Sequence, residues 1–212
     1  MYLTIVFVGM VAVTLVNWLA LGWSFFGALG WTAATTGIEL GIMIIFAFLA
    51  GVCTPRCFYR EGKIYAVGKR EIAFYRAVGL PKWKDHVLEL GIVGGFSKKQ
   101  LVAPNDPQYI DKFIFEINKG MFVHWVGIMA SFLILAVPVP GLWSVRLPVA
   151  LVCAVLNILP VMVLRYNKPR LLLLKKRLLR NQPVDAVFTP PAAVTPAEEQ
   201  PAEEEQPAKE AA

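Results

Sequence analysis

The sequence predicts an all-α integral membrane protein, with about four transmembrane helices in two hairpins and amphipathic interfacial helices in a cytoplasmic loop. Hydrophobic residues make up 57% of the 212 residues and the mean hydropathy is +0.56, yet the formal net charge is +6. The apolar residues fall in long blocks, and the basic residues lie between these blocks. Membrane spans joined by cytoplasmic loops produce this separation.

The first apolar block predicts an N-terminal transmembrane hairpin over residues 1–53. No charged side chain occurs in residues 1–38. Because about 20 helical residues cross a hydrocarbon core of ~30 Å, we expect spans at Tyr2–Leu21 and Trp31–Val52, with a turn at Gly22–Gly30 between them. A cleaved signal peptide is the alternative, but it requires a basic start, and no Lys or Arg precedes Arg56.

Residues 54–119 are expected to form a basic cytoplasmic or interfacial loop, with twelve Lys or Arg against seven Asp or Glu. Apolar and basic residues alternate at roughly helical spacing over Tyr65–Leu80, which predicts an amphipathic helix on an anionic membrane surface. Asp106 followed by Pro107 is typical of a helix start and predicts a second helix that ends near Asn118.

The second apolar block predicts a C-terminal hairpin over residues 120–182, with spans at about Met121–Val139 and Leu147–Leu164. The basic segment Arg165–Arg180 follows, and residues 183–212 read as a disordered acidic tail of Pro, Ala and Glu. Nineteen of the 21 Lys and Arg lie in the central loop and in the post-span segment. The positive-inside rule therefore predicts a multi-pass protein of the cell membrane with both termini in the cytoplasm.

This topology places a polar layer at headgroup depth, where the third span enters the membrane and the fourth leaves it. His124 lies about one turn inside the third span, where an imidazole can accept a proton from a lipid hydroxyl near neutral pH. Glu116 would orient it if the chain turns between the two residues. The alternative is that His124 only forms a hydrogen bond within the helix pair.

The other polar residues of the apolar blocks have structural explanations. We expect Glu39 to be protonated and bonded to Asn17, or to Thr35 and Thr36, within the first hairpin. The three cysteines and two histidines are too few and too irregularly spaced to predict a metal site, and no cofactor is expected. The sequence contains none of the glycine-rich nucleotide-binding motifs and no GxSxG nucleophile motif.

The lysines of the central loop have two interpretations. Lys82, Lys84, Lys98 and Lys99 would attract anionic membrane lipids, or bind the phosphates of an acyl donor such as acyl-CoA. Because the membrane accounts for the basic residues, nucleic acid is not an expected partner.

Several short motifs in one order resemble a known family. They are Lys82–Trp83–Lys84–Asp85, then Gly94–Gly95–Phe96–Ser97–Lys98–Lys99, then Glu116 with His124–Trp125, then Asn157, and last Arg165–Tyr166–Asn167–Lys168–Pro169–Arg170–Leu171. Together they resemble the glycosyl-4,4'-diaponeurosporenoate acyltransferases of staphyloxanthin-type carotenoid synthesis. The chain departs from the family pattern at Leu164, Met121 and Lys168.

The resemblance implies a membrane O-acyltransferase that moves a fatty acyl group onto a sugar hydroxyl of a glycosylated lipid, such as a carotenoid glycoside. His124 would be the base and Glu116 its orienting residue. The expected substrate-binding residues are Lys82, Trp83, Lys84, Asp85, Phe96, Lys98, Lys99, Trp125, Asn157, Arg165, Tyr166, Asn167 and Arg170. The alternative is a non-catalytic membrane scaffold, or an adaptor that binds anionic lipid.

Overall fold

The computed structural model describes residues 2–52, 62–87 and 101–180, and every regular element in these ranges is a helix. The long helices are α1 (Tyr2–Leu15, continued by the π-helix η1, Val16–Ala20), α2 (Phe25–Val52), α6 (Pro107–Ala130) and α7 (Leu147–Arg180). The short elements are η2 (Lys63–Tyr65), α4 (Lys69–Ala77), α5 (Leu80–Trp83), η3 (Lys84–His86), η5 (Leu133–Ala136) and η6 (Leu142–Arg146). The expected tail at 183–212 lies outside the described residues.

Within the described ranges, four helical stretches are long and apolar enough to cross a membrane: Leu3–Ala20, Phe25–Val52, Pro107–Ala136 and Leu142–Arg180. The predicted fold class and the number of spans are therefore confirmed. The first connection is shorter than expected, because α2 already begins at Phe25, inside the predicted turn.

The third span differs from the prediction, because the expected interfacial helix and the expected span are one continuous helix. Asp106 caps α6 by accepting a hydrogen bond from the Gln108 amide at 2.9 Å, and Pro107 occupies the first turn. No break occurs at Gly120. The flanking Ile117 and Met121 are almost fully buried, so packing holds the helix straight through this glycine.

The fourth span is also longer than predicted. The expected basic segment Arg165–Arg180 continues α7 and is not a separate element, although Pro160 and Pro169 lie inside the helix. A proline normally breaks a helix by removing one hydrogen bond. Here Leu164 and Leu171, on either side of Pro169, are buried in the same core.

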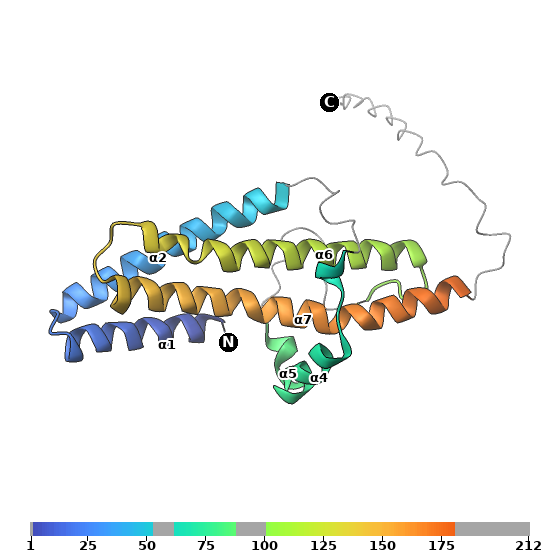
Figure 1. The fold of residues 1–212 in the computed structure, drawn as a ribbon, viewed down its shortest axis with the longest axis horizontal. Coiled ribbons are helices and arrows are strands. Elements are labelled where there is room, and N and C mark those ends of the chain that lie inside the picture. The colour runs from blue at the N-terminus through green and yellow to red at the C-terminus, as the bar shows by residue number, and fades with distance from the viewer. Residues whose placement is uncertain (1, 53–61, 88–100, 181–212) are drawn as a thin grey trace, which may run out of the picture. The chain divides into compact units, whose positions relative to one another are not determined.

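Among the described residues, the larger of two buried hydrophobic clusters lies where α6 and α7 run side by side (Figure 1). Its buried residues are Tyr65, Ile110, Phe113, Ile114, Ile117, Met121, Leu164 and Leu171. The first half of α6 thus packs against the second half of α7, and Tyr65 of the central segment completes the cluster. This core holds in place the motif residues of α6 and α7 that were singled out in the sequence.

The central segment is less helical than expected. The predicted helix over Tyr65–Leu80 is split, because Tyr65 belongs to η2 and α4 begins only at Lys69. Gly79 has a φ of +69°, a left-handed conformation that turns the chain from α4 into α5. The short α4 and α5 can therefore pack side chains onto α7 at an angle that one straight helix would not allow.

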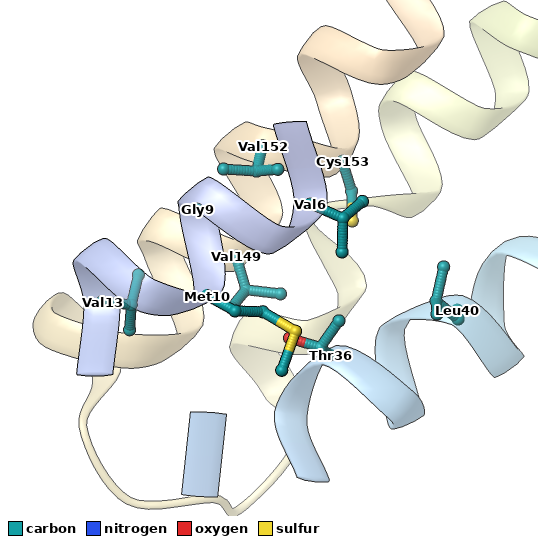
Figure 2. Close-up of a pocket in the computed structure, with 9 residues that line it drawn as sticks. All are labelled: Val6, Gly9, Met10, Val13, Thr36, Leu40, Val149, Val152 and Cys153. Atoms are coloured by element: carbon teal, nitrogen blue, oxygen red, sulfur yellow. The ribbon is translucent and has the colours of Figure 1, made fainter. Parts of the chain in front are cut away.

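The helix α1 packs against α2 and α7 with little space left over. Figure 2 shows the narrow pocket between these three helices, lined by apolar side chains together with Thr36 and Cys153. A Cβ atom added at Gly9 would lie 3.2 Å from a methyl group of Val152. The small residue thus lets α1 approach α7 closely, as is common between membrane helices.

The expected hydrogen bonds of Glu39 are not present. Asn17 donates to the carbonyl oxygens of Val13 and Ser144 at 2.8 and 2.9 Å, so it ties the first hairpin to the second. The hydroxyls of Thr35 and Thr36 donate to carbonyls one turn earlier in α2. Glu39 is fully buried, and neither of its carboxyl oxygens has a hydrogen-bond partner among the described residues.

Candidate active site

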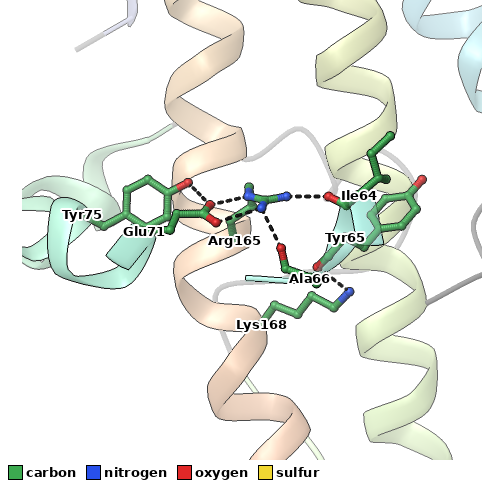
Figure 3. Close-up of polar contacts among 7 residues, drawn as sticks. All are labelled: Ile64, Tyr65, Ala66, Glu71, Tyr75, Arg165 and Lys168. Atoms are coloured by element: carbon green, nitrogen blue, oxygen red, sulfur yellow. Dashed lines mark hydrogen bonds and ion pairs between the residues drawn. The ribbon is translucent and has the colours of Figure 1, made fainter. Parts of the chain in front are cut away.

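Arg165 of α7 lies at the centre of a polar network that joins three segments of the chain. Its Nε donates to Glu71 of α4, and one Nη donates to the same carboxylate at 2.9 Å (Figure 3). The two Nη atoms also donate to the carbonyl oxygens of Ile64 and Ala66, each at 2.8 Å. Four of the five guanidinium N–H groups are therefore used by the protein itself.

The carboxylate of Glu71 also accepts a hydrogen bond from the hydroxyl of Tyr75, one turn later in α4. The hydrogen bond from Arg165 holds the pKa of Glu71 below its usual range, despite partial burial. Burial, followed by the hydrogen bond to Glu71, raises the pKa of Tyr75 to about 12. Glu71 is thus ionised and Tyr75 neutral throughout the physiological range.

An aromatic pair covers one side of this network. Tyr65 and Trp125 are stacked with ring centroids 5.4 Å apart, and the Arg165 guanidinium lies 5.9 Å from the centroid of Trp125. Lys168, which is only 3% exposed, donates to the Tyr65 carbonyl oxygen at 3.1 Å. The ammonium group also lies 5.3 Å from the Tyr65 ring, so Lys168 and Arg165 both contact the η2 segment.

His124 of α6 faces Asn157 of α7, with 3.1 Å between His124 Nδ1 and Asn157 Oδ1. The Asn157 amide nitrogen donates to the carbonyl oxygen of Cys153 at 3.0 Å, so its oxygen points toward the imidazole. In the tautomer that makes this contact a hydrogen bond, Nδ1 carries the proton and Nε2 carries the lone pair.

Gly127 permits this contact between the two helices. A Cβ atom at Gly127 would lie 2.5 Å from Asn157 Oδ1 and 2.9 Å from its Cγ. Any larger residue would therefore push the amide away from its present position. No sequence pattern marks this role, because glycines are common in membrane-spanning helices.

The expected pairing of Glu116 with His124 is not present. The two residues are eight positions apart on the uninterrupted helix α6, which separates them by about 12 Å along the axis and by about 80° around it. The prediction required the chain to turn between them, and packing of Ile117 and Met121 prevents that turn. Asn157 takes the position beside the imidazole instead.

The remaining motif residues occupy several places. Tyr166 is buried against Tyr75 and Leu80, and its hydroxyl accepts a hydrogen bond from Arg170 at 3.0 Å. Trp83 donates to the carbonyl oxygen of Val78 at 3.2 Å, and Lys84 pairs with Asp85 at 3.3 Å. Lys82 is exposed and Asn167 is half-buried, whereas Phe96, Lys98 and Lys99 lie outside the described residues.

Glu71, Tyr65 and Lys168 were not among the expected site residues. Glu71 and Arg165 are 94 positions apart, and no local pattern marks such a pair. In the described ranges, no group of three His, Cys, Asp or Glu side chains is placed to hold a metal ion.

The sequence model of the glycosyl-4,4'-diaponeurosporenoate acyltransferase family matches residues 55–177, which is more than half of the chain. The chain belongs to this family. The match contains both the Arg165 network and the His124–Asn157 pair, whereas α1 and α2 lie before it. No curated protein and no solved structure gives a significant match to the chain.

Membership of this acyltransferase family makes the chain an enzyme that transfers an acyl group and acts in carotenoid glycoside modification. The four apolar helices make it a membrane enzyme. The alternative of a non-catalytic scaffold or adaptor is therefore not favoured.

Proposed function

We propose that this acyltransferase moves a fatty acyl group from an activated donor onto a sugar hydroxyl of a glycosylated lipid, such as a carotenoid glycoside. The His124–Asn157 pair is the observation that supports this reaction most directly. A histidine held in one tautomer by an amide oxygen has the geometry of a general base. The His124–Asn157 pair lies inside the family match, on the two helices α6 and α7 that carry several of the motifs.

In the proposed reaction, His124 Nε2 accepts the proton of the acceptor hydroxyl as its oxygen attacks the acyl carbonyl carbon. The new ester C–O bond forms and the bond between the acyl group and the donor's leaving atom breaks. The leaving group then takes the proton from the imidazolium. Asn157 acts as a positioning residue, because its carbonyl oxygen holds Nδ1–H and stabilises the imidazolium.

The Arg165 network has a supporting role in this proposal. Most N–H groups of Arg165 donate to Glu71 and to two carbonyl oxygens. Its main role in the proposal is therefore to position η2 and α4 at the site, and not to bind the sugar. Lys82, which is exposed, and Lys84 remain candidates for the phosphates of a donor such as acyl-CoA. Asn167 and Arg170 remain candidates for contacts to the acceptor sugar.

The proposed orientation places the site at the cytoplasmic face of the cell membrane, with both termini in the cytoplasm. The support is the distribution of basic residues, nineteen of which lie in residues 54–119 or in Arg165–Arg180. Membrane lipids then surround the four spans, and both substrates reach the site at the level of the headgroups.

Acyl transfer in membranes tests the proposal. Labelled long-chain acyl-CoA is supplied with a panel of glycosylated lipids that includes a carotenoid glycoside, using wild type, His124→Ala and His86→Ala at matched expression. We expect product with wild type and with His86→Ala, which removes the other, exposed histidine. His124→Ala should lose about 100-fold to 10,000-fold of the rate, the usual contribution of a general base. Equal rates for all three proteins would exclude His124 as the base.

A further inference from the structure

A groove on the α2-facing side of α6 begins at the aromatic pair of the candidate site. It has a volume of about 650 Å³, within the range of pockets that hold one small ligand. Phe46 of α2 and Ile64 line it together with a row of α6 and η5 residues that ends at Leu133. The lining is almost entirely apolar.

The α6 part of the lining follows one face of the helix. Trp125 and Met129 are four residues apart, which is the spacing of one helical stripe, and Leu133 follows as the first residue of η5. The stripe extends about 6 Å along the α6 axis from Trp125 to Met129, and Leu133 lies beyond the end of that helix. All of these residues lie within the third membrane span, so the groove follows the span away from the site.

The two ends of the groove differ in chemistry. At one end, the Trp125 ring stacks on Tyr65 and lies 5.9 Å from the Arg165 guanidinium. His124 precedes Trp125 in the same helix. Beyond Trp125, the described residues that line the groove are all apolar, Met129 and Leu133 among them. A ligand that fits both ends has a polar, reactive head and one hydrocarbon chain.

We propose that this groove holds the fatty acyl chain of the donor and that Leu133, at its far end, limits the length of that chain. The inference rests on the proposed function, which supplies an acyl donor at the His124 end. Because lipid tails are as apolar as the groove, an acyl chain binds in the groove only slightly more favourably than it lies in the bilayer. Its effect is to hold the chain in one place, so chain-length selection is the property to measure.

Two opposite substitutions at Leu133 test the limit. Leu133→Trp shortens the groove and Leu133→Ala lengthens it, while Phe132→Trp and Phe132→Ala are matched controls. Phe132 is the neighbouring residue, is similarly exposed (38% against 43%), and does not line the groove. Each protein receives an equimolar mixture of acyl-CoA donors of graded length, and the product lipids are quantified by mass spectrometry.

We expect Leu133→Trp to raise the ratio of short-chain to long-chain product about tenfold or more, and Leu133→Ala to lower it. A hydrophobic pocket discriminates one methylene on this scale. The Phe132 variants should leave the ratio as in wild type. The same distribution from all five proteins, or the same shift from both positions, would overturn the groove assignment while leaving the proposed function intact.

A crosslinking experiment tests the groove even if no turnover is observed. Purified protein in nanodiscs is irradiated with a fatty acyl-CoA that carries a diazirine at the chain terminus, or with a phosphatidylcholine that carries the same group. We expect the acyl-CoA to label peptides containing Met129 and Leu133, and Leu133→Trp to reduce that labelling. Equal labelling by phosphatidylcholine would show ordinary bilayer lipid in the groove and would overturn the proposal.

Discussion

At the scale of single residues, the candidate site depends on how closely two helices approach. His124 and Asn157 meet because Gly127 presents no side chain between α6 and α7. Asn157 is itself held by the Cys153 carbonyl, one turn earlier in α7. A backbone carbonyl oxygen thus orients the amide side chain that contacts the imidazole.

Gly127→Ala tests this arrangement without altering any group that would contact substrate. Its Cβ would lie 2.5 Å from Asn157 Oδ1, so the amide must move and release His124 Nδ1. We expect kcat to fall about tenfold or more, with KM nearly unchanged, since a misplacement of about 1 Å can cost ~100-fold. Initial rates in membranes measure both constants.

Gly37→Ala on α2 is the matched control, because a Cβ there has open space around it. It should keep the wild-type rate. Full activity of Gly127→Ala would show that the His124–Asn157 contact does not contribute to turnover.

At the scale of elements, the short helix α4 is attached to α7 mainly through the Glu71–Arg165 pair and the contact of Tyr75 with Tyr166. A bidentate contact of this kind needs a planar guanidinium on one side and an ionised carboxylate on the other. The attachment should therefore depend on pH in a predictable direction.

The pKa of Glu71 is lower in the folded protein than its usual value, so the pair stabilises the attachment above that value. This stabilisation is lost as the pH falls from about 4, the usual pKa of a Glu, through the lowered pKa of Glu71. We expect hydrogen-exchange protection of residues 69–77, corrected for intrinsic rates, to fall over this window. In Glu71→Gln and Arg165→Lys, the protection factor of these residues at neutral pH should be about tenfold lower than in wild type, because hydrogen bonds to charged groups contribute about 1.5–3 kcal/mol.

The Glu71→Gln protein should also lose the dependence of this protection on pH. The same dependence on pH in Glu71→Gln as in wild type would contradict the assignment.

The buried Glu39 of α2 is a second feature at this scale. The Ser131 hydroxyl lies beside it but donates to the Gly127 carbonyl oxygen at 2.9 Å, which leaves both carboxyl oxygens without a partner among the described residues. A buried polar group without a hydrogen bond lowers the free energy of unfolding by about 1–3 kcal/mol.

Replacing Glu39 with Met, a similar volume without polar atoms, should raise the thermal unfolding midpoint in detergent by an amount corresponding to about 1–3 kcal/mol. Glu39→Gln, which keeps a buried polar group, should give little or no gain. Circular dichroism during heating measures both variants. A lower midpoint for Glu39→Met would show that the carboxyl makes a stabilising interaction.

At the scale of the whole molecule, the four spans and the basic segments together predict which connections face each side of the membrane. The connection between α6 and α7 is held by Arg146, whose guanidinium donates to the carbonyl oxygens of Leu135 and Val137 at 2.7 and 2.5 Å. The Arg146 guanidinium is therefore hydrogen-bonded within the connection itself. This one basic residue does not weaken the prediction that the connection lies on the outer side.

Cysteine labelling in intact cells tests this topology. In a background with Cys53, Cys57 and Cys153 replaced by Ser, Trp143→Cys should react with a membrane-impermeant maleimide, because Trp143 is 77% exposed in the connection that we propose to lie outside. Arg177→Cys, which is exposed near the end of α7, should react only after the cells are permeabilised. The opposite pattern would place the candidate site outside the cytoplasm.

The sequence by itself determined the membrane class, the four spans and the family. Long apolar blocks with almost no charged side chains predict membrane spans, and five short motifs in one order identify the acyltransferases. Those signals depend on composition and on neighbouring residues, so they can be read without coordinates. The boundaries of the third and fourth spans were less accurate, because packing at Ile117, Met121 and Leu171 extends both helices past Gly120 and Pro169.

The tertiary structure alone decided the partners within the site. Sequence order favoured Glu116 as the residue that orients His124, but a continuous α6 separates them by about 12 Å. Asn157 is 33 positions from His124, and Glu71 is 94 positions from Arg165. Such pairs form because helix packing brings distant residues together, and no local pattern specifies which polar side chains will meet across a helix interface.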